Sequence, residues 1–73
     1  MGEPIETYCD GEVWRNRVGG REALPGEYRT REAAAEVGRS EARVRGVQHV
    51  IRSADGRVVE RNRYPRRSDE LPS

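Results

Sequence analysis

The sequence TREAAAEVGRSEARVRG, residues 30–46, carries the signals of one complete helix. Thr30 is a typical N-cap residue, because its hydroxyl accepts a hydrogen bond from a free backbone N–H of the first turn. Glu32 places a negative charge near the positive end of the helix dipole. Gly46 suits the left-handed conformation that often ends a helix. We therefore predict a helix over residues 31–45.

This helix has a narrow apolar stripe. At 100° per residue, small and β-branched side chains fall on one side, which we expect to pack on a sheet. The small residues there, Gly38 among them, favour a close approach of the helix to the sheet. Glu41 falls between members of the stripe, so we expect it at the edge, in solvent or paired with an arginine. The stripe consists of Ala33, Ala34, Val37 and Val44.

Before the helix, an Asp-Gly pair predicts a β-hairpin. Asp10-Gly11 interrupts residues 5–18, which otherwise carry apolar and β-branched side chains. A two-residue turn at this pair places Glu6 opposite Arg15. Because side chains alternate along a strand, one face is the better candidate for the core. That face holds Ile5, Thr7, Cys9, Trp14, Asn16 and Val18.

After the helix, Asp55-Gly56 predicts a second hairpin within residues 47–62. A two-residue turn puts His49 and Ile51 on the packed side. Neither face of this hairpin is cleanly apolar, and a slip of one residue would exchange the faces of one strand. The other face would hold Gln48, Val50, Arg52, Arg57, Val59, Arg61 and Arg63.

One helix between two hairpins predicts an α+β domain of ββαββ order, with an antiparallel sheet and a single helix packed on one face. We assign this domain to residues 5–64. Residues 1–4 are expected to be a flexible N-terminus, and residues 65–73, with two prolines, a disordered C-terminal tail. With 73 residues, the chain has room for one domain.

The composition predicts a thin core. Only 33% of the residues are hydrophobic and 37% are charged, but 14 basic and 13 acidic side chains nearly cancel, so self-repulsion does not oppose a compact state. Domains of this size often rely on disulfides, a metal or a second subunit. Cys9 is the single cysteine and cannot form an internal disulfide, which makes a homodimer one candidate assembly. The lone thiol and the lack of a long apolar run predict a cytoplasmic protein with no membrane partner.

The sequence offers few groups for catalysis or cofactor binding. Only Cys9 and His49 provide a nucleophile and a base. One cysteine and one histidine do not make a zinc site. Gly19-Gly20 lacks the Lys-Ser/Thr that follows in a phosphate-binding loop. We therefore expect a protein that is not an enzyme and that uses no cofactor and no metal.

Arginine placement is the one pattern that points to a function. All 14 basic residues are arginines, and the sheet face away from the helix collects six of them. The leading hypothesis is a non-catalytic binding or interaction module that self-associates through this open face. The alternative is binding of the nucleic-acid phosphate backbone, since guanidinium groups contact phosphate in a bidentate manner and an exposed tyrosine stacks on bases. A face that is only solvated would look the same. The candidate residues are Tyr8, Val13, Arg15, Arg17, Arg52, Arg57, Arg61 and Arg63.

The order of these motifs resembles a known bacterial family, the one catalogued as domain of unknown function 2188. The resemblance covers about residues 5–64 and implies a small ββαββ domain with no assigned activity, so no functional residue is carried over. At Glu41 the chain departs from the family, which tends to place Leu or Met there. The motifs are Trp14 on a strand, TREAA at 30–34, Gly46, DGRV at 55–58 and ERN at 60–62.

Overall fold

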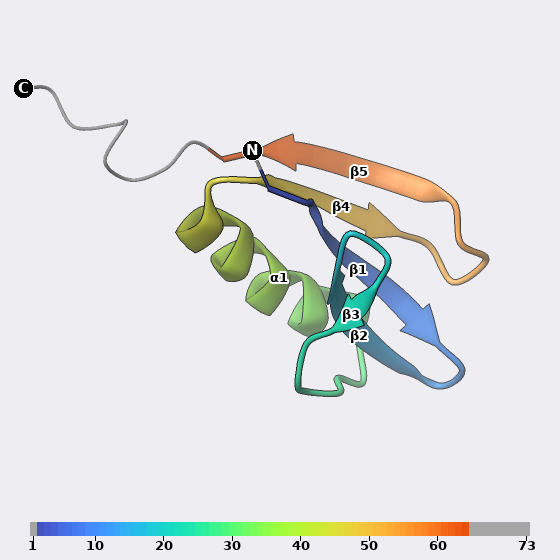
Figure 1. The fold of residues 1–73 in the computed structure, drawn as a ribbon. Coiled ribbons are helices and arrows are strands. Elements are labelled where there is room, and N and C mark those ends of the chain that lie inside the picture. The colour runs from blue at the N-terminus through green and yellow to red at the C-terminus, as the bar shows by residue number, and fades with distance from the viewer. Residues whose placement is uncertain (1, 65–73) are drawn as a thin grey trace, which may run out of the picture.

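The computed structural model describes residues 2–64, in which one helix lies on one face of a twisted five-stranded sheet (Figure 1). The strand order across the sheet is β3-β2-β1-β4-β5, and α1 packs on β1, β2 and β4. The predicted α+β class and the order of hairpin, helix and hairpin are confirmed. The elements are β1 (Ile5–Asp10), β2 (Val13–Val18), β3 (Glu22–Ala23), α1 (Arg31–Arg45), β4 (Gln48–Arg52) and β5 (Val58–Arg63). The expected tail, residues 65–73, lies outside the described residues.

The sheet is mixed, and the prediction of a purely antiparallel sheet is wrong. The two hairpins join through β1 and β4, which run parallel, with Ile5 opposite His49. Parallel neighbours need a long crossover, and α1 provides it by carrying the chain back along the sheet to the end where β1 starts. The short strand β3, which lies between the first hairpin and the helix, adds a fifth strand beside β2.

The register of the first hairpin differs from the prediction by two residues. Asp10 pairs with Val13, so Gly11 and Glu12 form the turn and Glu6 lies opposite Arg17. The predicted turn would give Asp10 a positive φ, whereas the structure gives it to Gly11, at 71°. A shift of two residues preserves the alternation of side chains, so each strand keeps its predicted faces.

In the second hairpin the predicted register holds for most of its length. The pairs from Gln48 with Arg63 to Ile51 with Glu60 are those expected from the sequence. The register then shifts by one between Ile51 and Arg52, so that Arg52 lies opposite Val58. The shift is typical of a β-bulge, which places one extra residue on one of the two strands.

The predicted ends of the helix are confirmed. The Thr30 hydroxyl accepts a hydrogen bond of 3.1 Å from the Ala33 amide. Gly46 ends the helix in the left-handed conformation, with φ 69° and ψ 42°, and its N–H reaches the carbonyls of Ala42 and Arg43. Both ends are therefore determined by local sequence, as capping rules predict.

The packed face of α1 differs from the predicted apolar stripe. Its buried residues are Ala34, Ala35, Gly38 and Ala42. Val44 is 80% exposed and Val37 38% exposed, so the two valines face away from the sheet. The reason is steric: a Cβ on Gly38 would lie 2.7 Å from both Thr7 Oγ1 and His49 Nε2. Only the side of the helix with the smallest residues fits against these polar side chains.

Gly38→Ala should therefore destabilise the protein, although alanine favours helices. Overpacking of a close contact typically costs about 1–3 kcal/mol, which exceeds the gain of about 1 kcal/mol in helix propensity. Urea unfolding measures the difference. The control is Ser40→Ala, on the exposed side of the same helix. A Gly38→Ala variant as stable as this control would show that the helix does not lie so close to the sheet.

Candidate functional site

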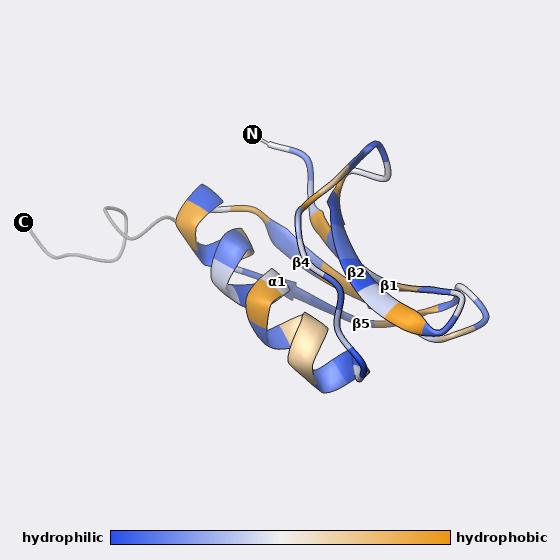
Figure 2. Ribbon diagram, turned by 90° about the horizontal axis from the view of Figure 1, so that it is seen from below, coloured by the Kyte–Doolittle hydropathy of each residue, from blue (hydrophilic) through white to orange (hydrophobic). Residues whose placement is uncertain are grey.

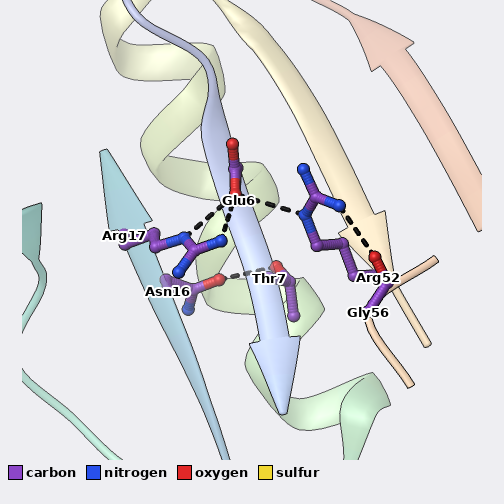
Figure 3. Close-up of polar contacts among 6 residues, drawn as sticks. All are labelled: Glu6, Thr7, Asn16, Arg17, Arg52 and Gly56. Atoms are coloured by element: carbon purple, nitrogen blue, oxygen red, sulfur yellow. Dashed lines mark hydrogen bonds and ion pairs between the residues drawn. The ribbon is translucent and has the colours of Figure 1, made fainter. Parts of the chain in front are cut away.

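The face of the sheet away from α1 is the candidate binding surface, which we call the open face. Figure 3 shows Glu6, Arg17 and Arg52 together in front of the strands, with the helix behind them. Cross-strand pairing puts four residues in one row, namely Arg17 on β2, Glu6 on β1, Val50 on β4 and Arg61 on β5. The row has arginines at both ends and one carboxylate between them.

Glu6 holds the centre of this face. Its Oε1 accepts hydrogen bonds from Arg17 Nε at 2.9 Å and from Arg52 Nε at 3.3 Å (Figure 3). Arg52 also donates to the carbonyl of Gly56 at 2.8 Å, which fixes the second turn to the sheet. Glu6 itself is only 9% exposed. A carboxylate this buried depends on its charged partners, so Arg17 and Arg52 have a structural role.

Other candidate residues on the open face are also occupied within the chain. The Arg17 guanidinium lies 4.3 Å from the centre of the Tyr8 ring, in cation–π geometry. Arg15 lies 3.4 Å from an Asp10 oxygen and 3.7 Å from a Glu27 oxygen. Val50, on the same face, is only 5% exposed. This half of the open face is therefore a closed layer of paired charges over apolar stems.

The β5 side of the open face is different. Arg61 and Arg63 are exposed and make no ion pair within residues 2–64, and we call them the β5 arginine pair. Glu6 lies two strands from Arg61, about 10 Å away at ordinary strand spacing. Arg57 lies beyond the register shift, where its carbonyl accepts from the Ser53 amide, and it faces Asp55 at 3.8 Å. Arg57 therefore does not continue the row of the β5 pair.

Beneath the helix, three polar side chains form a hydrogen-bonded chain. Asn16 Nδ2 donates to the Ala34 carbonyl at 3.0 Å, which leaves Asn16 Oδ1 to accept from the Thr7 hydroxyl at 2.6 Å. Because the single hydroxyl hydrogen of Thr7 is used in this way, His49 Nε2 must donate to Thr7 Oγ1, at 2.8 Å. The other ring nitrogen, Nδ1, is buried without a partner in the described part of the chain. Sequence alternation placed these residues on the packed side, but it gave no sign that they would bond to one another.

The pair of Cys9 and His49, the one combination considered for catalysis, does not form. His49 lies opposite Ile5 on the neighbouring parallel strand. Cys9 is four residues farther along β1, about 13 Å at 3.3 Å per residue. Its thiol donates to the carbonyl of Gly11 at 3.3 Å, near the tip of the first hairpin.

An open groove of about 350 Å³ lies beside α1, between the helix and β5. It is lined by both signs of charge and shows no preference for one kind of ligand. Within residues 2–64 no cluster of three or more metal-ligating side chains is found. The lining residues are Arg31, Glu32, Ala35, Glu36, Arg39, Ile51 and Glu60.

The fold and the open face define a small α+β domain that covers one side of its sheet and leaves a charged side free. The chain belongs to the bacterial family described as "Uncharacterized protein conserved in bacteria (DUF2188)", whose model matches residues 5–64. This confirms the family resemblance seen in the sequence motifs. No curated protein and no solved structure matches the chain. In the described part of the chain, the helix is too short and too polar to span a membrane.

The buried histidine should make stability depend on pH. Burial lowers the pKa of His49 below the ordinary histidine value of 6.5, the Arg39 guanidinium lowers the pKa further, and the Glu60 carboxylate opposes them. Protonation therefore favours the unfolded chain, so this contribution is complete above pH 6.5 and is lost as the pH falls toward the lower folded pKa. We expect urea unfolding to show lower stability at pH 5.5 than at pH 7.5.

His49→Gln should reduce this pH dependence, since ordinary carboxylates stay ionised over that range. An NMR titration of the imidazole in the wild-type protein gives a second measurement that needs no variant. A His49 pKa at or above 6.5 would show that burial does not disfavour the charged imidazole in this fold.

Proposed function

We propose that the protein is a small non-catalytic binding module that acts through the open face of its sheet. The helix covers the other face, and the alternation of side chains assigns six guanidinium groups of the described chain to the open face. Four of these groups are paired with carboxylates within the fold, namely Arg15, Arg17, Arg52 and Arg57. Binding to an external partner then falls to the β5 side.

The partner that fits this side best is the phosphate backbone of a nucleic acid. The observation that carries the proposal is the β5 arginine pair, two exposed guanidinium groups on an edge strand with no carboxylate bound to them in residues 2–64. A planar guanidinium offers two parallel donors to a phosphate group. In the sequence, Arg66 and Arg67 follow shortly after this pair and add to the positive charge of the segment.

Self-association through the open face is the second candidate. It would use Val59, which is 51% exposed, together with the half-buried Val13. Val50 and Tyr8 contribute little to such a contact, because Val50 is already covered and Tyr8 lies under Arg17. The apolar area left on this face is therefore small compared with that of stable dimer interfaces.

Replacing the β5 arginine pair tests the nucleic-acid proposal. Arg61→Gln and Arg63→Gln should each reduce the slope of log K against log salt by about one, as expected for a lost phosphate contact. Fluorescence anisotropy with single-stranded and double-stranded oligonucleotides at several salt concentrations gives the slopes. Arg29→Gln is the matched control, since Arg29 is exposed in the segment before α1. Absence of binding at low salt, or equal losses in the control, would sink the proposal.

Glu6→Gln should act in the opposite direction. Without the carboxylate, Arg17 and Arg52 lose their common partner and become available to phosphate, so the salt slope should increase by about one to two. The same variant should be less stable, because two guanidinium groups lose a charged hydrogen-bond acceptor. Glu12→Gln removes an equal charge at the exposed hairpin turn and is the control. Equal affinity changes in both variants would show that only net charge matters.

A further inference from the structure

The outer side of α1 carries apolar residues that the fold does not use. Among residues 2–64, the large hydrophobic side chains that are exposed are Val37 and Val44 on α1 and Val58 and Val59 on β5. Ala33 and Ser40 are exposed as well. Two views related by a 90° turn show the described chain leaving the outer side of the helix uncovered (Figure 1 and Figure 2).

The four exposed residues of α1 repeat at the spacing of a heptad, and we call them the seam. They are Ala33, Val37, Ser40 and Val44. Their spacing of four, three and four residues is that of a and d positions, which bring two helices together. The face that packs on the sheet is a separate one, made of alanines and Gly38. The seam therefore lies on a side of the helix that contributes nothing to the monomer's own core.

Two charged residues on the edge of this seam indicate the charges that a partner docked on the seam must carry. Glu36 and Arg43 are exposed, lie seven residues apart along α1, and make no ion pair within residues 2–64. Seven residues span about 10 Å of helix, too far for the two to pair with each other. The Arg43 guanidinium lies 5.3 Å from the centre of the Tyr64 ring, a contact that leaves its charge uncompensated.

A second copy of the same helix, running antiparallel, satisfies both charges. Residue i then meets residue j and residue j meets residue i, so Glu36 of each copy lies near Arg43 of the other, and the contact occurs twice. Val37 packs near Ser40, and Val44 near Ala33, of the second copy. A parallel pair would instead bring Glu36 of one copy beside Glu41 of the other, two like charges. On the other edge of the seam, Glu41 is already held by Arg45 at 3.0 Å.

We propose that the chain forms a weak antiparallel homodimer through the outer side of α1. The seam contributes two valines per copy, so association requires high protein concentration. In this dimer the two sheets lie on the outside and their open faces point away from each other. The dimer would then present two β5 arginine pairs, which strengthens binding to a long polyanion through avidity.

Sedimentation equilibrium of the full chain over a range of concentrations tests the proposal. We expect a monomer at micromolar concentration and a growing dimer fraction toward the millimolar range. Val44→Asp should abolish the dimer and leave the fold intact, as checked by circular dichroism, because Val44 is largely exposed. At about 1 mM even a weak specific dimer is populated. A wild-type chain that stays monomeric up to this concentration therefore overturns the dimer proposal.

A charge exchange tests the antiparallel arrangement. Glu36→Arg and Arg43→Glu should each weaken the dimer by about three- to tenfold, since exposed pairs are individually weak and symmetry doubles the effect. The double variant should restore it, and failure to do so overturns the arrangement. If Val59→Asp dissociates the dimer and Val44→Asp does not, the contact is through the open face and the helix proposal is wrong. Arg61→Gln should leave the dimer unchanged, so the two proposals fail separately.

Discussion

The close approach of α1 to the polar side chains beneath it determines the rest of this structure. Gly38 has no Cβ, and the space that a Cβ would need is occupied by oxygen and nitrogen atoms of Asn16, Thr7 and His49. These side chains bond to one another, which ties β2, β1 and β4 together, and Asn16 ties β2 to the helix through the Ala34 carbonyl. Hydrogen bonds are directional, and a buried set of them fixes one arrangement of helix and sheet.

This polar layer explains how so small an apolar content supports a fold. The buried apolar cluster in the described chain is small and consists of Ile5, Ala42 and Val47, with Val18, Leu24 and Tyr64 packed against it. Where the apolar side chains end, the hydrogen-bonded chain continues the contact between helix and sheet. Every member is needed, since a buried donor or acceptor left without a partner is costly. The Nδ1 of His49, which has no partner among residues 2–64, is the weak point of the layer, and its protonation is the step that would disrupt it.

The elements of the fold could be predicted from the sequence because their signals are local. Thr30 and Gly46 end the helix by bonds within a few residues, and the two Asp-Gly pairs locate the hairpins. The parallel pairing of β1 with β4 could not be predicted, because it joins residues more than 40 positions apart. The register of the first hairpin depends on which turn residue takes a positive φ, a choice that the dipeptide alone leaves open.

The packed side of α1 was mispredicted for a physical reason that extends beyond this chain. A hydrophobic stripe indicates the buried side of a helix when the facing sheet is apolar. Here the facing residues are Thr7, Asn16 and His49, so steric fit outweighs hydrophobicity and the valines turn outward. A row of polar residues on the helix-facing side of the sheet, together with a glycine inside the helix, was the signal in the sequence that could have indicated this.

The number of arginines on the open face does not show how many of them are available to a partner. Strand alternation is enough to gather arginines on one side of the sheet, because it requires only the two-residue period. Whether an arginine is available to a partner depends on acids brought near it by other strands, and Glu6 meets Arg52 only because β1 and β4 are neighbours. The pairing of β1 with β4, which completes the sheet, therefore holds the arginines of half of the open face in ion pairs within the fold. It leaves the edge strand β5, which has a neighbour on one side only, as the place where guanidinium groups have no carboxylate partner among residues 2–64.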